Sequence, residues 1–246
     1  MILTIAAREW RSLFLSPLAW TVLAAQQGLM AWIFLLLVQD FQALQGRLAG
    51  VENAPGVTDL VVAPLFRIAA WSLLLITPLA TMRLFSVERR ARTLDLLLSA
   101  PVSAVDMVLG KYLGAVLFLW VGAGLAGLMP LSLALGATLD VGKLLAGLLG
   151  LGLLAAGFAA AGLYLSTLTV QPIAAAAATF ALLLGLWVVD LQETTNRLFG
   201  YLSPLRYYDA LLLGLVNSAD LAYYLLFSAL FLGLAIRRVD DLRLRD

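Results

Sequence analysis

The sequence contains no cysteine and no histidine. It therefore has no thiol for redox or nucleophilic chemistry, and no imidazole for metal ligation or acid–base catalysis at neutral pH. These absences exclude a serine–histidine–aspartate triad and the H-E-x-x-H zinc motif. A phosphate-binding loop is missing too, because Gly110-Lys111 lacks the upstream glycine frame and the Ser/Thr that would hold magnesium. We expect no nucleotide, metal or other cofactor on this chain.

Charged residues are scarce as well. They make up 13% of the 246 residues, and hydrophobic residues make up 63%. A soluble domain has roughly 25% charged and roughly 45–50% apolar residues. An apolar excess of this size belongs in lipid rather than in one water-soluble core. The net charge of +1 gives no basic footprint for nucleic acid, so we expect no nucleic-acid partner.

Long apolar runs supply the architecture. A helix needs about 20 mostly apolar residues to cross the bilayer. Six segments meet this length approximately, so the sequence predicts an all-α membrane protein with six transmembrane helices in a single domain over residues 1–246. The predicted spans lie at about residues 18–38, 62–82, 108–131, 144–165, 172–191 and 219–236.

Residues 1–16 precede the first span and mix apolar and charged residues. The apolar residues recur at roughly helical spacing, and Arg8, Glu9 and Arg11 lie between them. This pattern predicts an amphipathic helix lying on the membrane surface, with Pro17 marking the turn into the first span. A cleaved signal peptide is the competing interpretation. The long apolar run and the absence of a small-residue cleavage site favour an uncleaved helix.

The distribution of Lys and Arg predicts the orientation. With the N-terminus in the cytoplasm, eleven of the sixteen Lys/Arg residues fall on the cytoplasmic side and five on the other. Positive residues concentrate on the cytoplasmic side of membrane proteins. With six spans, both termini are then cytoplasmic.

Two outer segments differ in character. Residues 39–61 are polar and carry glycines and a proline, so we expect a loop with little structure of its own. Within residues 192–219, Ser203 and Pro204 predict the N-cap and first residue of a helix whose apolar positions recur at helical spacing. Arg206 and Asp209 could pair on that helix. The segment is too short to span, so we predict a re-entrant or interfacial helix.

Small residues four apart are frequent in the spans, for example Gly152 with Ala156 and Gly157 with Ala161. Such pairs allow close helix contact. We favour packing within one subunit over a dedicated dimer seam.

Arg67 is the clearest cation inside a predicted span. Its side chain can snorkel to the outer interface, and a contact with a transported substrate is the alternative.

The stretch from Glu88 to Lys111 is too charged to cross lipid and too apolar for a plain solvated loop. Thr93 to Ser99 carries apolar residues on one helical face, and Ala100-Pro101 ends that helix. Ser103 can cap the following helix, with Asp106 three residues on. The pattern predicts a helix–break–helix elbow at the membrane surface. A partner protein could push on the elbow, although a basic inner loop without a partner has the same composition.

Two motifs resemble a known family. Glu88-Arg-Arg-Ala-Arg-Thr-Leu-Asp-Leu-Leu-Leu-Ser-Ala-Pro-Val102, with Val108-Leu-Gly-Lys111, is similar to the loop between the second and third spans of type-2 ABC transporter permeases. Ser203-Pro-Leu-Arg-Tyr-Tyr-Asp209, with Gly214-Leu-Val216, resembles their outer re-entrant region. The likeness covers nearly the whole chain in layout. Within the family it is greatest to the gliding-motility-type and nitrous-oxide-reductase-maturation-type permeases.

The resemblance implies a non-enzymatic membrane subunit of an ATP-driven exporter in a bacterial or archaeal cell inner membrane. Two permease copies, identical or different, would pair, and each would dock a separate ATPase subunit that carries ATP and magnesium. An auxiliary outer-side subunit and membrane lipid are further candidate partners. The implied ATPase-coupling residues are Glu88, Arg89, Arg90, Thr93, Leu94, Leu97, Leu98 and Pro101. The candidate path or outer-gate residues are Arg67, Ser203, Pro204, Arg206, Tyr207 and Asp209.

A second class of function stays open beside this one. The chain could be an ion- or proton-driven secondary carrier, or a membrane scaffold that transports nothing. A carrier is expected to have charged or broken helices near the middle of the membrane. The predicted spans offer almost none, so the sequence favours the permease. It does not identify the cargo.

Overall fold

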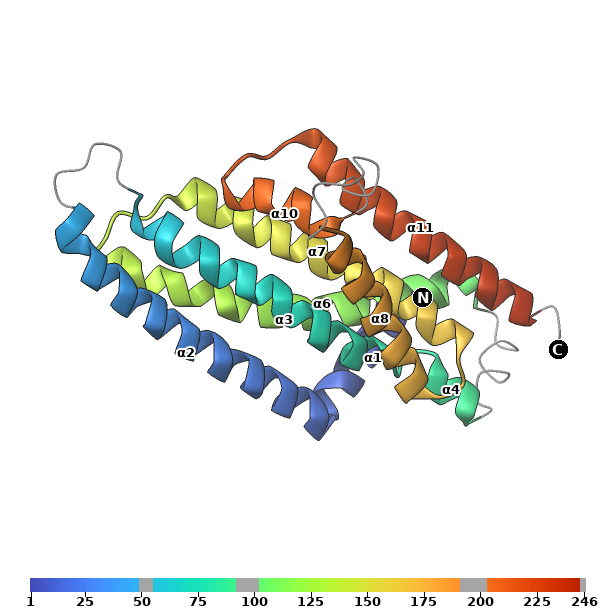
Figure 1. The fold of residues 1–246 in the computed structure, drawn as a ribbon. Helices are drawn as coiled ribbons and strands as arrows, with labels where there is room; N and C mark the ends of the chain where they lie inside the picture. The colour runs from blue at the N-terminus through green and yellow to red at the C-terminus, as the bar shows by residue number, and fades with distance from the viewer. Residues whose placement is uncertain (49–54, 92–101, 191–202, 244–246) are drawn as a thin grey trace.

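Long helices lie side by side along one axis and form the body of the molecule (Figure 1). The computed structural model describes residues 1–48, 55–91, 102–190 and 203–243, and the secondary structure in these ranges is helical with no strand. Five helical segments are long and apolar enough to cross a membrane. They contain α2 (Pro17–Leu48), α3 (Ala63–Thr81), α6 (Ala104–Leu131), α7 (Val141–Leu168) and α11 (Ser218–Arg243). The all-α membrane class is therefore confirmed.

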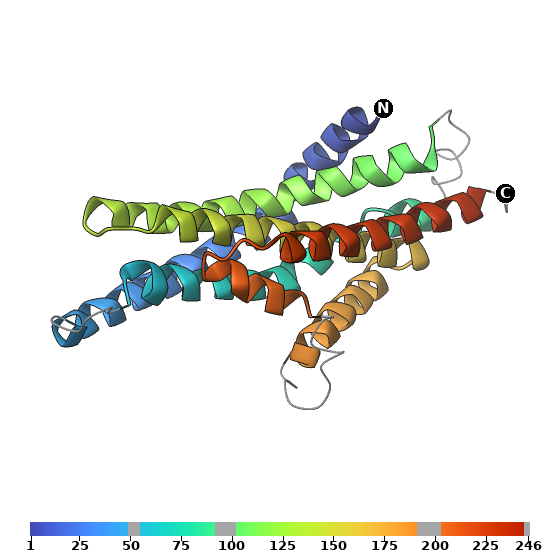
Figure 2. The ribbon, with the colours of Figure 1, turned by 90° about the horizontal axis from the view of Figure 1, so that it is seen from above.

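The remaining predicted span, the fifth in chain order, is α8 (Pro172–Asp190), and it is short. Its apolar part, Pro172–Val188, falls below the length of the other five segments. The turn between α7 and α8 takes only residues 169–171, and the two helices are in contact. Figure 2 shows α8 leaving the long helices at an angle.

Local sequence signals set several helix starts. Helix α1 (Ile2–Leu15) is separated by the single residue Ser16 from Pro17, where α2 begins, and Pro17 was predicted to mark this turn. Ser103 caps α6: its hydroxyl accepts a hydrogen bond from the Asp106 N–H at 3.0 Å and donates to the Asp106 carboxylate at 2.7 Å. The Ser103 cap satisfies one of the backbone donors that the first turn of a helix leaves unpaired.

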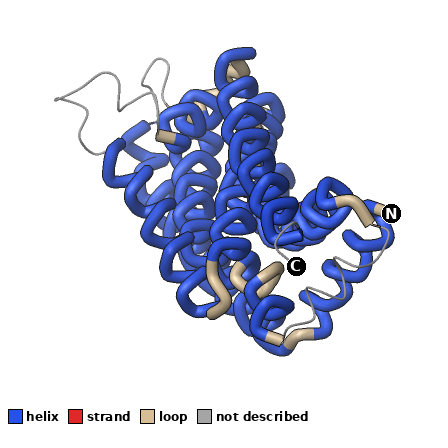
Figure 3. Tube along the Cα trace, turned by 90° about the vertical axis from the view of Figure 1, so that its right-hand side faces the viewer, coloured by secondary structure: helices blue, strands red, loops and turns tan. Residues whose placement is uncertain are grey.

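Helix α7 forms the centre of the bundle, and its glycines let neighbouring helices approach. Gly147 faces Phe66 on α3, Gly157 faces Phe227 on α11, and Gly162 faces Thr81 at the end of α3. Small residues at such positions bring helix backbones close together. At these positions the packing lies within one subunit. Figure 3, which looks along the long helices, shows them gathered into one bundle with the N-terminus at its edge.

The prediction of a loop with little structure at residues 39–61 is wrong for most of the residues that the structure describes there. Helix α2 continues through Gln39 and Asp40 to Leu48, and a π-helix, η1 (Thr58–Val62), precedes α3. Hydropathy locates the part of a helix that lies in lipid, and a helix can continue beyond it into polar sequence. A short 3-10 helix, η2 (Ser132–Leu135), follows α6 at the same end of the bundle.

The short helix predicted before the last span is present as α10 (Pro204–Leu212) and packs inside the bundle. Pro204, Leu205, Tyr208, Leu211 and Leu212 are buried against α3, α7, α8 and α11. Ser203 occupies the N-cap position as predicted, but its buried hydroxyl makes no hydrogen bond with the described residues. After α10 the chain reverses at Gly214, whose φ of 81° lies in the left-handed region that favours glycine.

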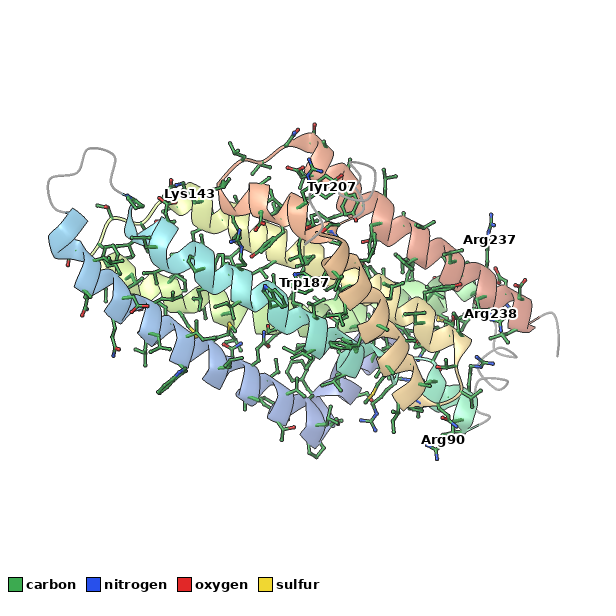
Figure 4. The ribbon with its side chains drawn as sticks, viewed as in Figure 1. Arg90, Lys143, Trp187, Tyr207, Arg237 and Arg238 are labelled. Atoms are coloured by element: carbon green, nitrogen blue, oxygen red, sulfur yellow. The ribbon has the colours of Figure 1, made fainter. Side chains whose placement is uncertain are left out.

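The two ends of the bundle differ in what they carry. The terminal end carries α1, the C-terminal part of α11 and α4 (Ser86–Arg90), a short helix after α3. The distal end carries the connection between α6 and α7 and the last turns of α2. Arg90, Arg237 and Arg238 lie at the terminal end and Lys143 lies toward the distal end (Figure 4).

Candidate functional site

Helix α1 docks on α6 through two glycines. A Cβ atom at Gly110 would lie 2.6 Å from the Ile5 Cβ, and one at Gly114 would lie 2.8 Å from the Glu9 Cβ. No larger residue fits at this separation without moving one of the helices. In Figure 2, α1 runs obliquely along α6 at the terminal end. The close contact fixes where the charged side chains of α1 point.

One of those side chains completes a charge cluster that joins three helices. The Lys111 Nζ on α6 donates to Glu9 of α1 at 2.9 Å and to Glu88 of α4 at 2.7 Å. The Arg8 guanidinium lies 3.4 Å from the same Glu88 carboxylate. The ammonium group also lies 5.2 Å from the centre of the Phe85 ring. We call Arg8, Glu9, Glu88 and Lys111 the Lys111 cluster.

The cluster is balanced in formal charge, and three of its four side chains are largely buried. The Lys111 side chain is 2% exposed, and the side chains of Glu9 and Glu88 are 12% and 13% exposed, whereas Arg8 is 63% exposed at the rim. Moving charged groups out of water is costly unless each finds an opposite charge. Removing Lys111 leaves two largely buried carboxylates without that partner, so this ammonium group holds α1, α4 and α6 in one arrangement.

Arg89 and Arg90 are the other predicted coupling residues that the structure describes. They lie on α4 beside Glu88 and point in different directions. The Arg89 guanidinium donates to the backbone oxygen of Thr167, near the end of α7, at 2.6 Å. Arg90 is exposed and points away from the bundle (Figure 4). The remaining predicted coupling residues, Thr93, Leu94, Leu97, Leu98 and Pro101, lie outside the described residues.

The chain positions of the cluster members matter for its role. The predicted elbow, Glu88–Pro101, begins within α4, and its residues 92–101 lie outside the described residues. Glu88 of this stretch is tied by Lys111 to α6, and the same ammonium group ties in Glu9 of α1. Arg89 contacts α7. The described start of the predicted elbow is therefore in contact with α1, α6 and α7.

A second group of polar contacts lies away from the terminal end and holds α10. The Arg67 guanidinium on α3 donates two hydrogen bonds to the Asp209 carboxylate, at 2.6 Å and 3.1 Å. We expected the Arg67 side chain to snorkel to the outer interface, and Arg206 was a possible partner for Asp209. The structure pairs Arg67 with Asp209 across two helices, because α10 packs against α3.

Aromatic side chains complete the seating of α10. The buried Tyr208 hydroxyl donates to the Phe66 backbone oxygen at 3.1 Å, and the Tyr224 hydroxyl donates to the Pro204 backbone oxygen at 2.6 Å. Tyr207 stacks on Tyr223 of α11 with ring centroids 4.2 Å apart. Of the candidate gate residues, Arg67, Pro204, Tyr207 and Asp209 thus lie in contacts that tie α10 to α3 or α11.

Sequence reasoning missed the polar pair in the middle of α2. The buried Gln26 amide donates to the Ser72 hydroxyl of α3 at 3.2 Å, and the Gln27 amide donates to the Gly122 backbone oxygen of α6 at 2.9 Å. Two adjacent amides inside an apolar run were the available signal, because polar side chains in membrane helices need partners on neighbouring helices. Glu9 was noted as an interfacial charge, and Lys111 as the end of the Glu88 to Lys111 stretch and part of a family-like motif, but their pairing was not predicted.

Comparison with known proteins adds one finding. A family model described as "ABC-2 family transporter protein" matches residues 3–239. A search of the curated proteins gives no match. Among the described residues, no group of three or more acidic side chains is arranged to hold a metal ion.

Proposed function

The chain belongs to the ABC-2 family of transporter proteins, and from that premise we propose that it is the transmembrane subunit of an ATP-driven exporter. The family and the apolar helices identify it as a multi-pass permease subunit of an ABC transporter. In our proposal two permease copies form the translocation path. Each copy docks a separate ATPase subunit, which binds ATP and magnesium. An auxiliary subunit on the outer side is a further candidate partner.

The observation that carries the proposal is the Lys111 cluster. It joins α4, where the predicted elbow Glu88–Pro101 begins, to α6, and adds α1 to them through Glu9. In the proposed mechanism, ATP closes the ATPase dimer and the ATPase surface displaces the elbow. The buried charges make α1, α4 and α6 move together, since separating them would leave a charge without its partner. The Arg89 contact with Thr167 passes part of the displacement to α7.

The proposal places the terminal end in the cytoplasm of a bacterial or archaeal cell, with both termini on that side of the inner membrane. Support comes from the arginines gathered there, including Arg90, Arg237 and Arg238 (Figure 4). Cytoplasmic ends of membrane helices carry an excess of Lys and Arg. The side chains of Arg90 and Arg237 are also exposed, so Arg90 can meet a partner directly.

Co-purification tests the partner and charge reversal tests the contact. The tagged chain, purified from its own host in mild detergent, is expected to bring an ATPase subunit with it. Arg90→Glu should reduce the recovered ATPase by at least about tenfold, because like charges facing each other in an interface cost several kcal/mol. Arg237→Glu is the matched control: it reverses an exposed arginine at the same end but outside the elbow.

Two outcomes would reject the proposal. One is a wild-type chain that purifies without any nucleotide-hydrolysing partner. The other is an Arg90→Glu variant that retains both its partner and cargo-dependent ATP hydrolysis in proteoliposomes. Arg90 suits this test better than Arg89, because Arg89 holds Thr167 within the chain and its reversal would disturb the fold.

The alternative is a secondary carrier or a scaffold that transports nothing. Among the described residues, the buried charged side chains are Lys111 and Asp220. Each lies within about two turns of the start of its helix, at Ala104 and Ser218. That position offers little support for a mid-membrane proton relay. Proton-gradient-driven flux by the isolated chain in liposomes would favour the carrier.

A further inference from the structure

A cavity of about 1040 Å³ lies beside the Lys111 cluster, where α1 meets α2. Its walls come from α1, the first turns of α2, the last turns of α3 and the residues around α4. The two helices are separated by the single extended residue Ser16, so they diverge and leave space between them and α3. The volume falls at the upper end of the range of small-molecule sites, roughly 300–1,000 Å³.

Cations line this cavity in excess of carboxylates. Arg8, Arg11, Arg83 and Lys111 contribute to the lining, against Glu9 and Glu88. Lys111 and Arg8 are already paired with the two carboxylates. Arg11 and Arg83 form no ion pair with any residue that the structure describes, and both are exposed. Arg83 donates one hydrogen bond, to the Ser16 hydroxyl at 3.3 Å.

Each of these two arginines therefore has spare hydrogen-bond donors next to the cavity. A guanidinium carries five N–H groups in a planar fork, which matches the oxygens of a phosphate. The neighbouring carboxylates of Glu9 and Glu88 are already paired, with Lys111 and Arg8, so their two negative charges are balanced without Arg11 or Arg83. An anionic phosphate group is the ligand chemistry that fits this part of the cavity.

Most of the remaining wall is apolar. It includes Leu13, Val22, Ile76, Leu79 and Phe118. Two tryptophans lie close to it: Trp10 lines the cavity, and the exposed Trp20 donates to the Phe14 backbone oxygen on α1 at 2.7 Å. Tryptophan is enriched where membrane helices leave the hydrocarbon for the headgroup layer. The cavity therefore joins a charged part to an apolar part, which is the arrangement that a lipid with its headgroup and acyl chain would need.

We propose that this cavity binds an anionic phospholipid of the surrounding membrane. The phosphate contacts Arg11 and Arg83, and one acyl chain lies along the apolar wall between α1, α2 and α3. A free phosphate would leave the apolar wall uncovered, and a zwitterionic lipid would bring no net charge to the two arginines. The proposal goes beyond the transport function. It requires the terminal end to lie at headgroup depth, and it does not require an ATPase.

Native mass spectrometry of the purified full-length chain tests it. The probes are dioleoyl phosphatidylglycerol and dioleoyl phosphatidylcholine, which share acyl chains and differ in headgroup charge. The wild type should retain phosphatidylglycerol in preference to phosphatidylcholine. The double variant Arg11→Gln/Arg83→Gln should bind phosphatidylglycerol at least about tenfold more weakly, given the gain of each basic residue near an anionic lipid surface. Arg237→Gln removes an exposed arginine outside the cavity and should bind it as the wild type does.

Three results would overturn the proposal. The wild type could bind both lipids equally, the double variant could keep wild-type binding, or Arg237→Gln could weaken binding as much as the double variant. The last result would indicate attraction to any surface arginine. The ligand could also be a free phosphate ion, and competition with inorganic phosphate tests this. If millimolar phosphate displaced phosphatidylglycerol, the site would be assigned to a free anion.

Photolabelling keeps the test independent of the variants. Phosphatidylglycerol with a photoactivatable acyl chain should label peptides from residues 4–22 and 76–88 of the wild type, above the labelling of the exposed faces of α11. Even labelling of all lipid-facing helices would reject a defined site. Because both experiments use the permease alone, a missing ATPase partner would overturn the transport proposal and leave this one standing.

Discussion

Lys111 is the residue whose loss should disturb the fold most. Lys111→Met keeps much of the side-chain volume and removes the charge that two carboxylates share at 2.9 Å and 2.7 Å. Removing one partner from a buried ion pair costs about 3–5 kcal/mol, because the other charge stays buried. We expect the variant to unfold at a clearly lower temperature in a detergent thermal-shift assay, with early proteolysis of α1.

The control for this prediction is Lys143→Met. Lys143 also forms a short ion pair, with Asp59 at 2.6 Å, but its side chain is 30% exposed. Water can solvate the carboxylate that remains, so the loss should be much smaller than at Lys111. Equal losses in the two variants would show that the burial of the Lys111 cluster is not what stabilises this region.

The Arg67–Asp209 pair predicts a charge-swap result. Arg67→Glu places two carboxylates opposite each other between α3 and α10, and adding Asp209→Arg restores an ion pair. The side chains are 57% and 44% exposed, so the pair itself contributes only about 0–1 kcal/mol. Hydrogen exchange at the amides of residues 204–212 is the sensitive measurement. We expect faster exchange in the single variant and recovery in the double variant, and a failure to recover would contradict the pairing.

At the scale of single elements, local sequence predicted the helices well. Pro17, Ser103 and Pro204 begin or cap their helices as expected, because caps and prolines act within one turn. The error at residues 39–61 has a physical reason: a helix that has left the bilayer needs no apolar sequence to continue, so hydropathy gives no signal for its end.

Contacts between elements were the part that the sequence could not supply. Glu9 and Lys111 are 102 positions apart, and Arg67 and Asp209 are 142 positions apart. Their pairing depends on which helix faces lie together, and hydropathy does not order helices around a bundle. The Glu88 to Lys111 stretch was identified as a unit from its composition, but the buried bond between its two ends requires the reversal of the chain between α4 and α6.

The seating of α1 on α6 gives a prediction at the level of one helix pair. Gly110→Ala adds a methyl group that would lie 2.6 Å from the Ile5 Cβ, so α1 has to move away from α6. Overpacking of this kind costs typically about 1–3 kcal/mol. The shift also draws Glu9 away from Lys111. We expect reduced thermal stability and weaker coupling of ATP hydrolysis to transport in the complex with the ATPase.

Gly124→Ala on the same helix is the matched control for that change. A Cβ at Gly124 has no atom within 4 Å, so the substitution adds no contact. Alanine is the better helix former by roughly 1 kcal/mol, so this variant should be as stable as the wild type or more so. If Gly110→Ala behaved like Gly124→Ala, the docking of α1 on α6 would not be as close as described.

At the scale of the whole molecule, the two ends carry different contacts, and our transport proposal assigns them different tasks. The terminal end joins α1, α4, α6 and α7 through charged side chains and carries exposed arginines, so the proposal makes it the surface that receives force. Toward the other end, α10 is held by Arg67, Tyr208 and Tyr224, so the proposal makes it the outer gate. This division has meaning only if the terminal end faces the cytoplasm, where ATP is available.

Cysteine labelling tests that orientation directly, because the natural chain has no cysteine to give a background. Leu135→Cys places a thiol at a position that is 95% exposed between α6 and α7, and Arg237→Cys places one at an exposed position near the C-terminal end of α11. A membrane-impermeant maleimide added to intact cells, with the outer membrane permeabilised where the host has one, should label Leu135→Cys. It should reach Arg237→Cys only after the inner membrane is opened. The reverse pattern would put the arginine-rich end outside the cell, and the Lys111 cluster could then have no part in coupling to an ATPase.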